Sequence, residues 1–318
     1  MDIQAKTITD IISNVERVIV GKNAAIGLIL CAILADGHVL IEDVPGVGKT
    51  TMVYSIAKSL NMSYKRIQFT PDVLPSDITG FSMYNQKTGE FEYREGLVMS
   101  QIILADEINR TSPKTQSSLL EVMEERQITV DGNTYAAPDP FIVLATQNPI
   151  EHVGTYPLPE AQIDRFLMKI SLGYPNFQDE CAVLNRFRSS DPLDSLMPVT
   201  DVGMILHMRN ECKNVFIHPD IERYVVSLSS HTRSHPAVQL GVSPRGSIFL
   251  IRAAQAFAYI MGRNFVLPDD VQYLVPYVYS HRIIMRYDAR TRKITPESII
   301  EEALRTVQVP MLSGDRKR

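Results

Sequence analysis

The stretch HVLIEDVPGVGKT, residues 38–50, is the part of the sequence that decides the fold. Residues 38–42 are a short apolar run that predicts a buried strand, and residues 43–48 form a glycine-containing loop. A helix is predicted from Lys49 to residue 60. Because a helix N-terminus presents free backbone N–H groups, the order of strand, loop and helix predicts a binding site for a phosphate group.

The loop matches the Walker A pattern at its last positions, but Asp43 stands where the first glycine is normally found. Its glycines let backbone amides wrap phosphate oxygens, Lys49 adds a point charge for the β and γ phosphates, and the Thr50 hydroxyl can ligate Mg²⁺. A chance glycine-rich turn is the alternative, which the strand before and the helix after it disfavour. The nucleotide-binding residues predicted here are Val44, Pro45, Gly46, Val47, Gly48, Lys49, Thr50 and Thr51.

Three further apolar runs, separated by helical stretches, are predicted to be buried strands: residues 64–69, 102–105 and 141–146. Strands that alternate with helices predict an α/β fold with a mostly parallel sheet. Residues 22–35 have apolar side chains at helical spacing and predict a helix before the first strand. Two hairpins are predicted as well, one inserted at residues 81–93 and one around residues 131–133.

Polar side chains follow two of these strands. Asp106 and Glu107 come directly after residues 102–105, as a Walker B element requires beside a phosphate-binding loop. We expect Asp106 to hold magnesium and Glu107 to polarise the attacking water as general base; an exposed acidic pair is the alternative. Asn148 follows the strand at 141–146 and is expected to orient the water or contact the γ phosphate, although Asn before Pro is ordinarily a turn.

The strand signals stop after residue 175, and helical runs follow at residues 202–213, 220–232, 244–261 and 269–284. We therefore predict two domains. Residues 1–175 form an αβα nucleotide-binding core, and residues 176–318 form a small all-α domain. The length agrees with two domains, since 318 residues exceed the size at which single hydrophobic cores usually stop growing.

The composition excludes several classes of partner. With 32 Lys and Arg against 36 Asp and Glu, the net charge of -4 gives no broad positive field for nucleic acid. The three cysteines lie far apart, which predicts neither a disulfide framework nor a zinc site and fits a reducing cytosol. The longest apolar run, residues 24–35, is too short to cross a bilayer, so we expect a cytoplasmic protein without membrane insertion.

Four blocks in this order resemble the MoxR branch of the AAA+ ATPases: VPGVGKT (44–50), ADEINR (105–110), ATQNPIE (145–151) and GTYPLPEAQIDRF (154–166). The resemblance covers nearly the whole chain. It implies a P-loop AAA+ αβα core followed by a helical lid, with ATP and Mg²⁺ bound and a homo-oligomeric ring of six subunits. It also implies chaperone-like work on protein clients, such as metal-cofactor insertion or complex maturation, with von Willebrand factor A-domain partners.

The same resemblance implies roles for residues outside the strand ends. Arg165 matches the arginine finger, which stabilises transition-state charge in a neighbouring subunit; from spacing alone, an intrachain ion pair with Asp164 or another nearby carboxylate is the alternative. Arg245 matches the sensor-2 arginine of the lid, and Val20 and Gly21 belong to a segment that resembles one packing on adenine. The hairpin at 81–93 corresponds to the helix-2 insert, a candidate client contact or an ordinary surface hairpin.

An ATP-hydrolysing remodelling ATPase is the leading functional hypothesis. The alternatives are a nucleotide-dependent binding switch or scaffold, in which turnover only resets the shape, and a chelatase-type motor subunit. A nucleic-acid motor is disfavoured by the acidic net charge and by an insert hairpin whose basic residues are only Lys87 and Arg94.

Overall fold

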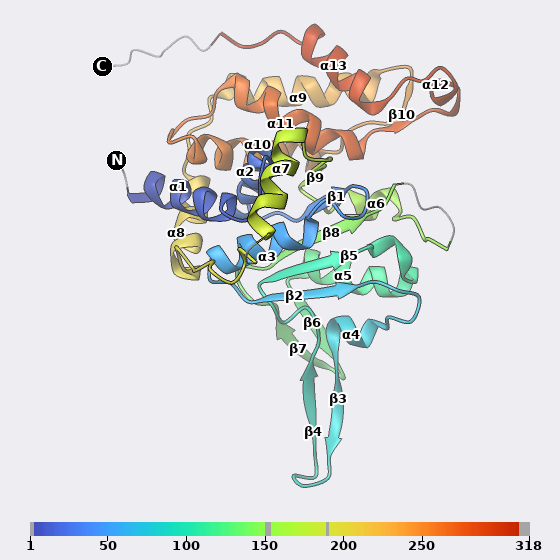
Figure 1. The fold of residues 1–318 in the computed structure, drawn as a ribbon. Helices are drawn as coiled ribbons and strands as arrows, with labels where there is room; N and C mark the ends of the chain where they lie inside the picture. Colours follow the sequence, from blue (N-terminus) through green and yellow to red (C-terminus); the bar gives the residue numbers. More distant parts are fainter. Residues whose placement is uncertain (1–2, 150–153, 189–190, 312–318) are drawn as a thin grey trace. The chain divides into compact units, whose positions relative to one another are not determined.

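The computed structural model describes residues 3–149, 154–188 and 191–311, and the chain divides into two compact units (Figure 1). The first unit contains the chain up to residue 166 together with residues 170–206, and the second contains residues 167–169 and the chain from 207 onward. The first unit therefore extends beyond the predicted domain boundary at residue 175. Helix α7 (Phe177–Phe187) belongs to it, since Arg186 donates a hydrogen bond of 2.5 Å to the Glu16 carbonyl of α1.

The chain contains a five-stranded sheet with the order β2-β5-β8-β1-β9; the first four of these strands lie in the first unit, whereas β9 begins in residues assigned to the second. The strands are β1 (Val39–Glu42), β2 (Tyr64–Gln68), β5 (Ile102–Asp106), β8 (Ile142–Gln147) and β9 (Met168–Ile170). Strand β8 pairs in parallel with β1 on one side and β5 on the other, and β5 pairs in parallel with β2. The α/β fold with a parallel sheet is confirmed. Because parallel strands end at the same edge, the residues that follow β1, β5 and β8 lie along one edge of the sheet.

Helices cover both faces of this sheet, as the nearly continuous burial of the residues along β5 and β8 requires (Figure 1). Ile103 and Val143 pack with Leu119 and Leu120 of α5 in one buried cluster. Helix α2 is apolar almost all round and is buried accordingly. The helices of this unit are α1 (Ile3–Glu16), α2 (Asn23–Leu34), α3 (Lys49–Ser59), α4 (Pro75–Thr79), the 3-10 turn η1 (Ile108–Arg110), α5 (Pro113–Glu125), α6 (Glu160–Ile163) and α7, with α8 (Val202–Lys213) running into the second unit.

Both predicted hairpins are confirmed. Strands β3 (Gly80–Asn85) and β4 (Glu90–Glu95) form an antiparallel arm that extends away from the sheet (Figure 1). Strands β6 (Gln127–Val130) and β7 (Asn133–Ala136) form the second, shorter hairpin. The two hairpins touch through the rings of Tyr93 and Tyr135, which stack with centroids 4.1 Å apart at an interplanar angle of 16°.

The second unit is built mainly from helices, in agreement with the predicted helical lid. Its elements after α8 are α9 (Pro219–Ser234), β10 (Val238–Leu240), α10 (Pro244–Ile260), α11 (Pro268–Tyr279), η2 (Ser280–Arg282), β11 (Ile284–Met285), α12 (Tyr287–Thr291) and α13 (Pro296–Thr306). Helix α10 packs on α9 and α11, and α13 packs on α9 and α11. No helix in the described part of the chain is long and apolar enough to cross a membrane.

Three expectations about the elements are corrected by the structure. Strand β2 is half-exposed and not buried, because it lies at the edge of the sheet. Strands do not stop after residue 175, since β10 and β11 pair in the second unit; at three and two residues they are too short to show periodicity. The helix expected over residues 269–284 ends at Tyr279, where a 3-10 turn leads into β11. The longer helices that were not predicted are α1, α7 and α13, and the short helices α4, α6 and α12 were not predicted either.

Candidate functional site

The loop between β1 and α3 contains two residues whose backbone conformation favours glycine. Gly46 has φ +85° and Gly48 has φ +87°, in the left-handed region where a Cβ atom is strained. A Cβ built on either residue would meet no described atom within 4 Å, so conformation and not crowding calls for glycine. Gly48 is the N-cap of α3, and the free N–H groups of the first helical turn begin beside the loop. This geometry suits an anion.

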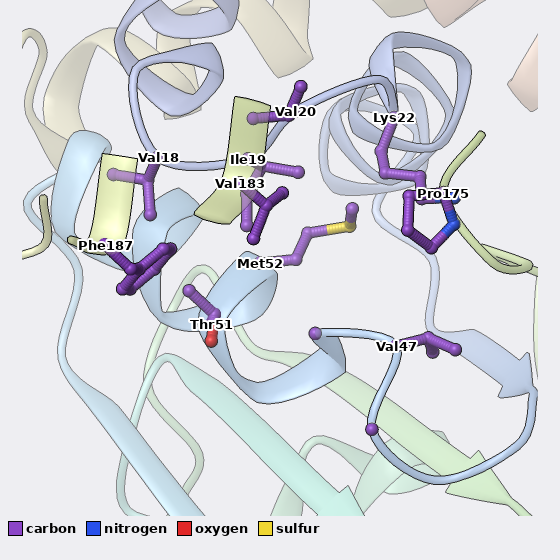
Figure 2. Close-up of a pocket in the computed structure, with 12 residues that line it drawn as sticks. Val18, Ile19, Val20, Lys22, Val47, Thr51, Met52, Pro175, Val183 and Phe187 are labelled. Carbon is purple, nitrogen blue, oxygen red and sulfur yellow. The ribbon is translucent and has the colours of Figure 1, made fainter. Parts of the chain in front are cut away.

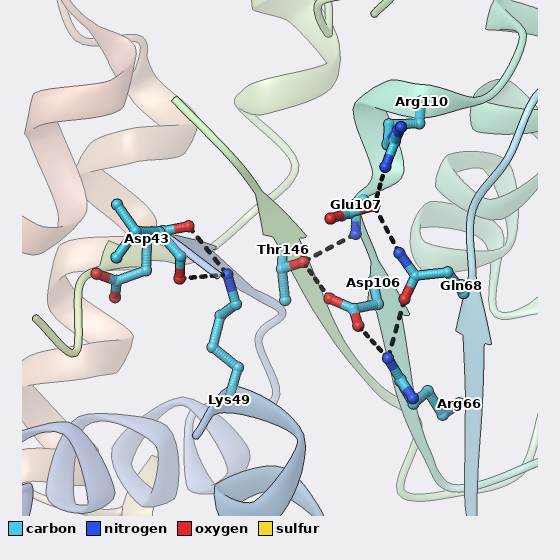
Figure 3. A network of polar contacts seen from close by, with 9 residues as sticks. Asp43, Lys49, Arg66, Gln68, Asp106, Glu107, Arg110 and Thr146 are labelled. Atoms are coloured by element: carbon cyan, nitrogen blue, oxygen red, sulfur yellow. Dashed lines mark hydrogen bonds and ion pairs between the residues drawn. The ribbon is translucent and has the colours of Figure 1, made fainter. Parts of the chain in front are cut away.

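Lys49 is the first residue of α3, and its side chain turns back over the loop (Figure 3). Its Nζ donates hydrogen bonds to the carbonyl oxygens of Asp43, at 2.9 Å, and Val44, at 3.3 Å. Phosphate oxygens are stronger acceptors for an ammonium group than carbonyl oxygens. The lysine is thus held within the loop, where a nucleotide phosphate would compete for the same donors.

A threonine of β8 joins the ends of two strands. Thr146 is fully buried, and its Oγ1 donates to Oδ1 of Asp106 at 2.7 Å while accepting from the backbone N–H of Glu107 at 2.8 Å (Figure 3). The other carboxylate oxygen of Asp106 accepts from Nη2 of Arg66 on β2 at 2.7 Å. Asp106 is therefore buried with both oxygens oriented, one by a hydroxyl and one by a guanidinium.

Glu107 leaves the strand with its backbone in the left-handed region, at φ 57° and ψ 50°. For a residue other than glycine this conformation costs free energy and is common at functional sites. Its Oε2 accepts from Nε2 of Gln68 at 2.5 Å and from Nη1 of Arg110 at 2.9 Å (Figure 3). The carboxylate is held by two donors on either side of the strand end.

The predicted core residues thus meet at one edge of the sheet. The register pairs Glu42 with Gln147, so the loop that follows β1 and the buried Asn148 that follows β8 are neighbours. On the other side of β8, Asp106 ends β5. Sequence reasoning placed these side chains together, but it missed Thr146, Arg66 and Gln68, which hold the two carboxylates. A polar residue at the end of an apolar strand was the only signal for Thr146.

Burial also affects a tyrosine of the edge strand next to this network. The hydroxyl of Tyr64 is buried and has no hydrogen-bond partner among the described residues. Loss of hydration raises the pKa of Tyr64 from 10.0 to about 12, with smaller opposing and supporting contributions from the charges of Arg66 and Asp106.

An apolar cavity of about 220 Å³ lies beside the loop (Figure 2). Three segments line it: residues 18–20 and Lys22 before α2, residues 46–52 of the loop and α3, and Pro175 with two side chains of α7. The lining residues are Val18, Ile19, Val20, Lys22, Gly46, Val47, Gly48, Thr51, Met52, Pro175, Val183 and Phe187. A largely apolar cavity next to a phosphate-binding loop suits a nucleoside, with its base against the aliphatic side chains.

Of the predicted residues, Val20, Gly46, Val47, Gly48 and Thr51 contribute to this cavity. Gly21 lies next to it with φ +69°, and a Cβ there would stand 2.0 Å from the Asp179 carboxylate of α7. The cavity residues contributed by α7 were not predicted, because α7 follows the domain boundary expected at residue 175.

Arg165 lies in the first unit and Arg245 in the second. Nε of Arg165 is 3.7 Å from Oε2 of Glu124 on α5. Arg165 therefore forms an ion pair within the chain, and its partner is Glu124 and not the adjacent Asp164. Arg245 lies in the first turn of α10, with its guanidinium 5.8 Å from the ring centroid of Phe249.

The residues expected to hold Mg²⁺ fit that ion chemically. The Thr50 hydroxyl and the Asp106 carboxylate are oxygen donors, which Mg²⁺ prefers. Within the described ranges no group of three His, Cys, Asp or Glu side chains is arranged to hold a metal. Magnesium at this site would therefore depend on water and nucleotide phosphates for its remaining ligands, as is usual for this ion.

Two protein-family models match the chain. The model described as ATPase family associated with various cellular activities (AAA) matches residues 38–168, which contain the loop, both carboxylates, Asn148 and Arg165. The model described as AAA lid domain matches residues 230–303, which contain Arg245. The two matches follow the order of the two compact units.

Known proteins resemble the chain over almost its full length. Protein YeaC of Bacillus subtilis is 54% identical over 94% of this chain and 94% of its own. Chaperone MoxR1 of Mycobacterium tuberculosis is 41% identical over 98% of this chain and 84% of its own. A crystal structure from Cytophaga hutchinsonii superimposes with a TM-score of 0.91 at 41% identity, covering 97% of this chain and 96% of that chain.

Proposed function

Because this chain belongs to the MoxR family of AAA ATPases and is an ATPase, we propose that it hydrolyses ATP between the subunits of a homo-hexameric ring to remodel a protein client. The observation that carries the proposal is the arm formed by β3 and β4, which exposes Tyr84 and Phe91 and belongs to the same unit as the nucleotide loop. A von Willebrand factor A-domain protein is the partner that the family resemblance implies.

Nucleotide binding is assigned to the edge of the sheet. The amides of the loop and Lys49 would bind the phosphates, while Thr50 and Asp106 would hold Mg²⁺, which supplies charge neutralisation on the phosphate oxygens. The apolar cavity that includes Val20 and Thr51 would bind the base and ribose. The support is geometric: the glycine conformations, the oriented Asp106 carboxylate and the cavity all occur along one edge.

Water activation is assigned to Glu107. One oxygen of its carboxylate, Oε2, already accepts two hydrogen bonds, so the other oxygen, Oε1, is the atom that would accept a proton from water. The buried Asn148 at the neighbouring strand end would orient that water or contact the γ phosphate. Arg165 and Arg245 would complete the pocket upon assembly, since a guanidinium stabilises charge that develops on the transferred phosphoryl group.

Client contact is assigned to the tip of the arm. Tyr84 is 52% exposed and Phe91 is 74% exposed, and their rings make an edge contact with centroids 5.4 Å apart. Exposed aromatic pairs are typical of protein-binding surfaces. The arm is also connected in sequence to the active site, because the chain runs from Gln68, which holds Glu107, through α4 into β3.

A trapping experiment tests this proposal. Glu107→Gln protein with ATP should capture client proteins, which should remain bound through a high-salt wash. Adding Phe91→Ser or Tyr84→Ser to this variant should abolish the capture. Val226→Ser, which alters a side chain 55% exposed on α9, is the matched surface control and should retain it. Capture of the same proteins with and without the arm substitutions would contradict the assigned client contact and favour a nucleotide-dependent scaffold.

A further inference from the structure

Residues 171–175, here called the strap, connect β9 to α7 and form part of the cavity through Pro175. The strap has no regular secondary structure, so its backbone polar groups need other partners. Two charged side chains supply them, one from the nucleotide loop and one from the segment before α2. Neither contact follows from the sequence, because more than 120 residues separate the partners.

Asp43 binds the N–H side of the strap. Its buried carboxylate accepts from Oγ of Ser171 at 3.1 Å, from the N–H of Gly173 at 3.2 Å and from the N–H of Leu172. The backbone carbonyl of the same Asp43 accepts from Lys49. Asp43 therefore links the strap directly to the phosphate-binding loop. The glycine that is usual at this position would have no side chain to make these bonds.

Lys22 binds the C=O side of the strap. Its Nζ donates to the carbonyl oxygens of Leu172 at 2.7 Å, Gly173 at 3.0 Å and Tyr174 at 3.0 Å. An ammonium group has three N–H donors, so all three are used on consecutive peptide groups. Leu172 and Gly173 are thus held from both sides, by a carboxylate at their N–H groups and by an ammonium at their carbonyls.

We infer that Asp43 and Lys22 are positioning residues that clamp the strap and thereby fix the nucleoside cavity against the phosphate-binding loop. Lys22 lines the cavity, Asp43 begins the loop whose later residues line it, and both side chains bind the strap, whose Pro175 lines it as well. Together they join segments that are distant in sequence. Charge-assisted hydrogen bonds are among the stronger polar contacts, and here six of them act on four residues. This inference rests on the proposed nucleotide site.

The Lys22 half of the clamp acts on the base side of the site, whereas Asp43 also belongs to the phosphate-binding loop through its carbonyl contact with Lys49. Loosening the clamp at Lys22 should weaken the binding of ATP, which contacts both the cavity and the loop. The binding of inorganic tripolyphosphate, which contacts the loop alone, should be weakened less. The variant that tests this most cleanly is Lys22→Met, because Lys22 makes no described contact with the loop carbonyls. Lys58→Met is the matched control, since Lys58 also donates to a backbone carbonyl, that of Leu193, at 2.8 Å but lies outside the cavity.

The experiment measures KM for ATP, kcat at saturating ATP and the inhibition constant of tripolyphosphate on full-length protein. For Lys22→Met we expect KM to rise about tenfold, because the three charge-assisted hydrogen bonds that hold the strap carbonyls are lost. The value of kcat and the inhibition constant of tripolyphosphate should each change less than about twofold. Lys22→Arg should show a smaller rise in KM for ATP than Lys22→Met. Asp43→Gly, which restores the usual Walker A glycine, should raise KM as well.

Two results would overturn the clamp. One is a KM for Lys22→Met equal to that of Lys58→Met, and the other is an equal loss of ATP and tripolyphosphate affinity, which would indicate general damage to the loop. Thermal unfolding of each variant shows whether it is folded at the assay temperature. If Lys22→Met is unfolded at that temperature, the KM of Lys22→Arg is compared with that of Lys58→Met instead. Absence of ATP turnover in the unsubstituted protein would instead contradict the proposed function itself.

Discussion

Thr146 is the residue that joins the ends of β5 and β8, because one hydroxyl serves both Asp106 and the Glu107 N–H. Replacing it with valine keeps the shape and removes both hydrogen bonds. We predict that Thr146→Val lowers the free energy of unfolding by about 1–3 kcal/mol, the cost of buried polar groups left unpaired. Glu107 would also lose its backbone anchor, so kcat should fall about tenfold.

Urea denaturation and steady-state ATPase assays check both parts of this prediction. Thr146→Ser keeps the hydroxyl and is the control, with near-normal kcat. An unchanged kcat in Thr146→Val, together with normal stability, would show that the hydroxyl does not position the catalytic carboxylate.

Tyr64 gives a prediction about alkaline pH. Burial raises its pKa from 10.0 to about 12, so between these values the unfolded chain loses the phenol proton and the folded chain keeps it. The unfolded state is then favoured, and stability falls as pH rises through this range. Tyr64→Phe should make this fall less steep while leaving stability at pH 7 unchanged or raised, because the hydroxyl has no partner among the described residues.

The measurement is urea unfolding at pH 7, 9 and 10.5. Tyr84→Phe, which removes a hydroxyl from an exposed tyrosine, is the matched control. Identical pH profiles for the unsubstituted protein and Tyr64→Phe would contradict the assigned cause.

At the scale of elements, the two hairpins of the first unit are connected by the stacked rings of Tyr93 and Tyr135. The Tyr93 hydroxyl also donates to the Thr79 carbonyl at 2.5 Å, at the base of the arm. We predict that Tyr135→Ala increases amide hydrogen exchange in β3 and β4 by about tenfold, since an aromatic pair contributes roughly 1 kcal/mol beyond burial. Exchange in the buried β5 should not change, and Tyr135→Phe should retain protection. Equal exchange in the arm of all three proteins would refute the coupling.

Individual helices and strands could be predicted from the sequence, but which of them lie next to one another in the fold could not. The strand, loop and helix at residues 38–60 follow from short-range patterns and agree with β1 and α3 within one residue. The edge position of β2 depends on the order of strands, which no local pattern encodes. The same holds for the site: Lys49, Asp106 and Glu107 are in recognisable motifs, whereas the contacts of Lys22 with residues 172–174 join positions about 150 apart.

At the scale of the whole molecule, Arg165 distinguishes an isolated chain from an assembly. In the single chain it pairs with Glu124, with both side chains about one-third exposed, and such pairs contribute little to stability. If it acts across an interface, Arg165→Ala should retain nucleotide binding and lose turnover. Mixing Arg165→Ala with Glu107→Gln should restore part of the activity, because an intact base and an intact finger then meet at mixed interfaces.

Glu124→Gln provides the control for this test, since it removes the ion pair and leaves the guanidinium in place. Turnover should persist in Glu124→Gln. If mixing restores no activity and Glu124→Gln also loses turnover, then turnover depends on the intrachain ion pair and not on an arginine finger.

Hydrolysis of ATP at the edge of the sheet requires a base, and the role is assigned to Glu107. Phosphate release by purified Glu107→Gln, measured together with its affinity for ATP, is the decisive test of this assignment. We predict that phosphate release falls at least about a hundredfold, the usual contribution of a general base, while the Kd for ATP changes less than about threefold. Release of phosphate at the unsubstituted rate would contradict the account.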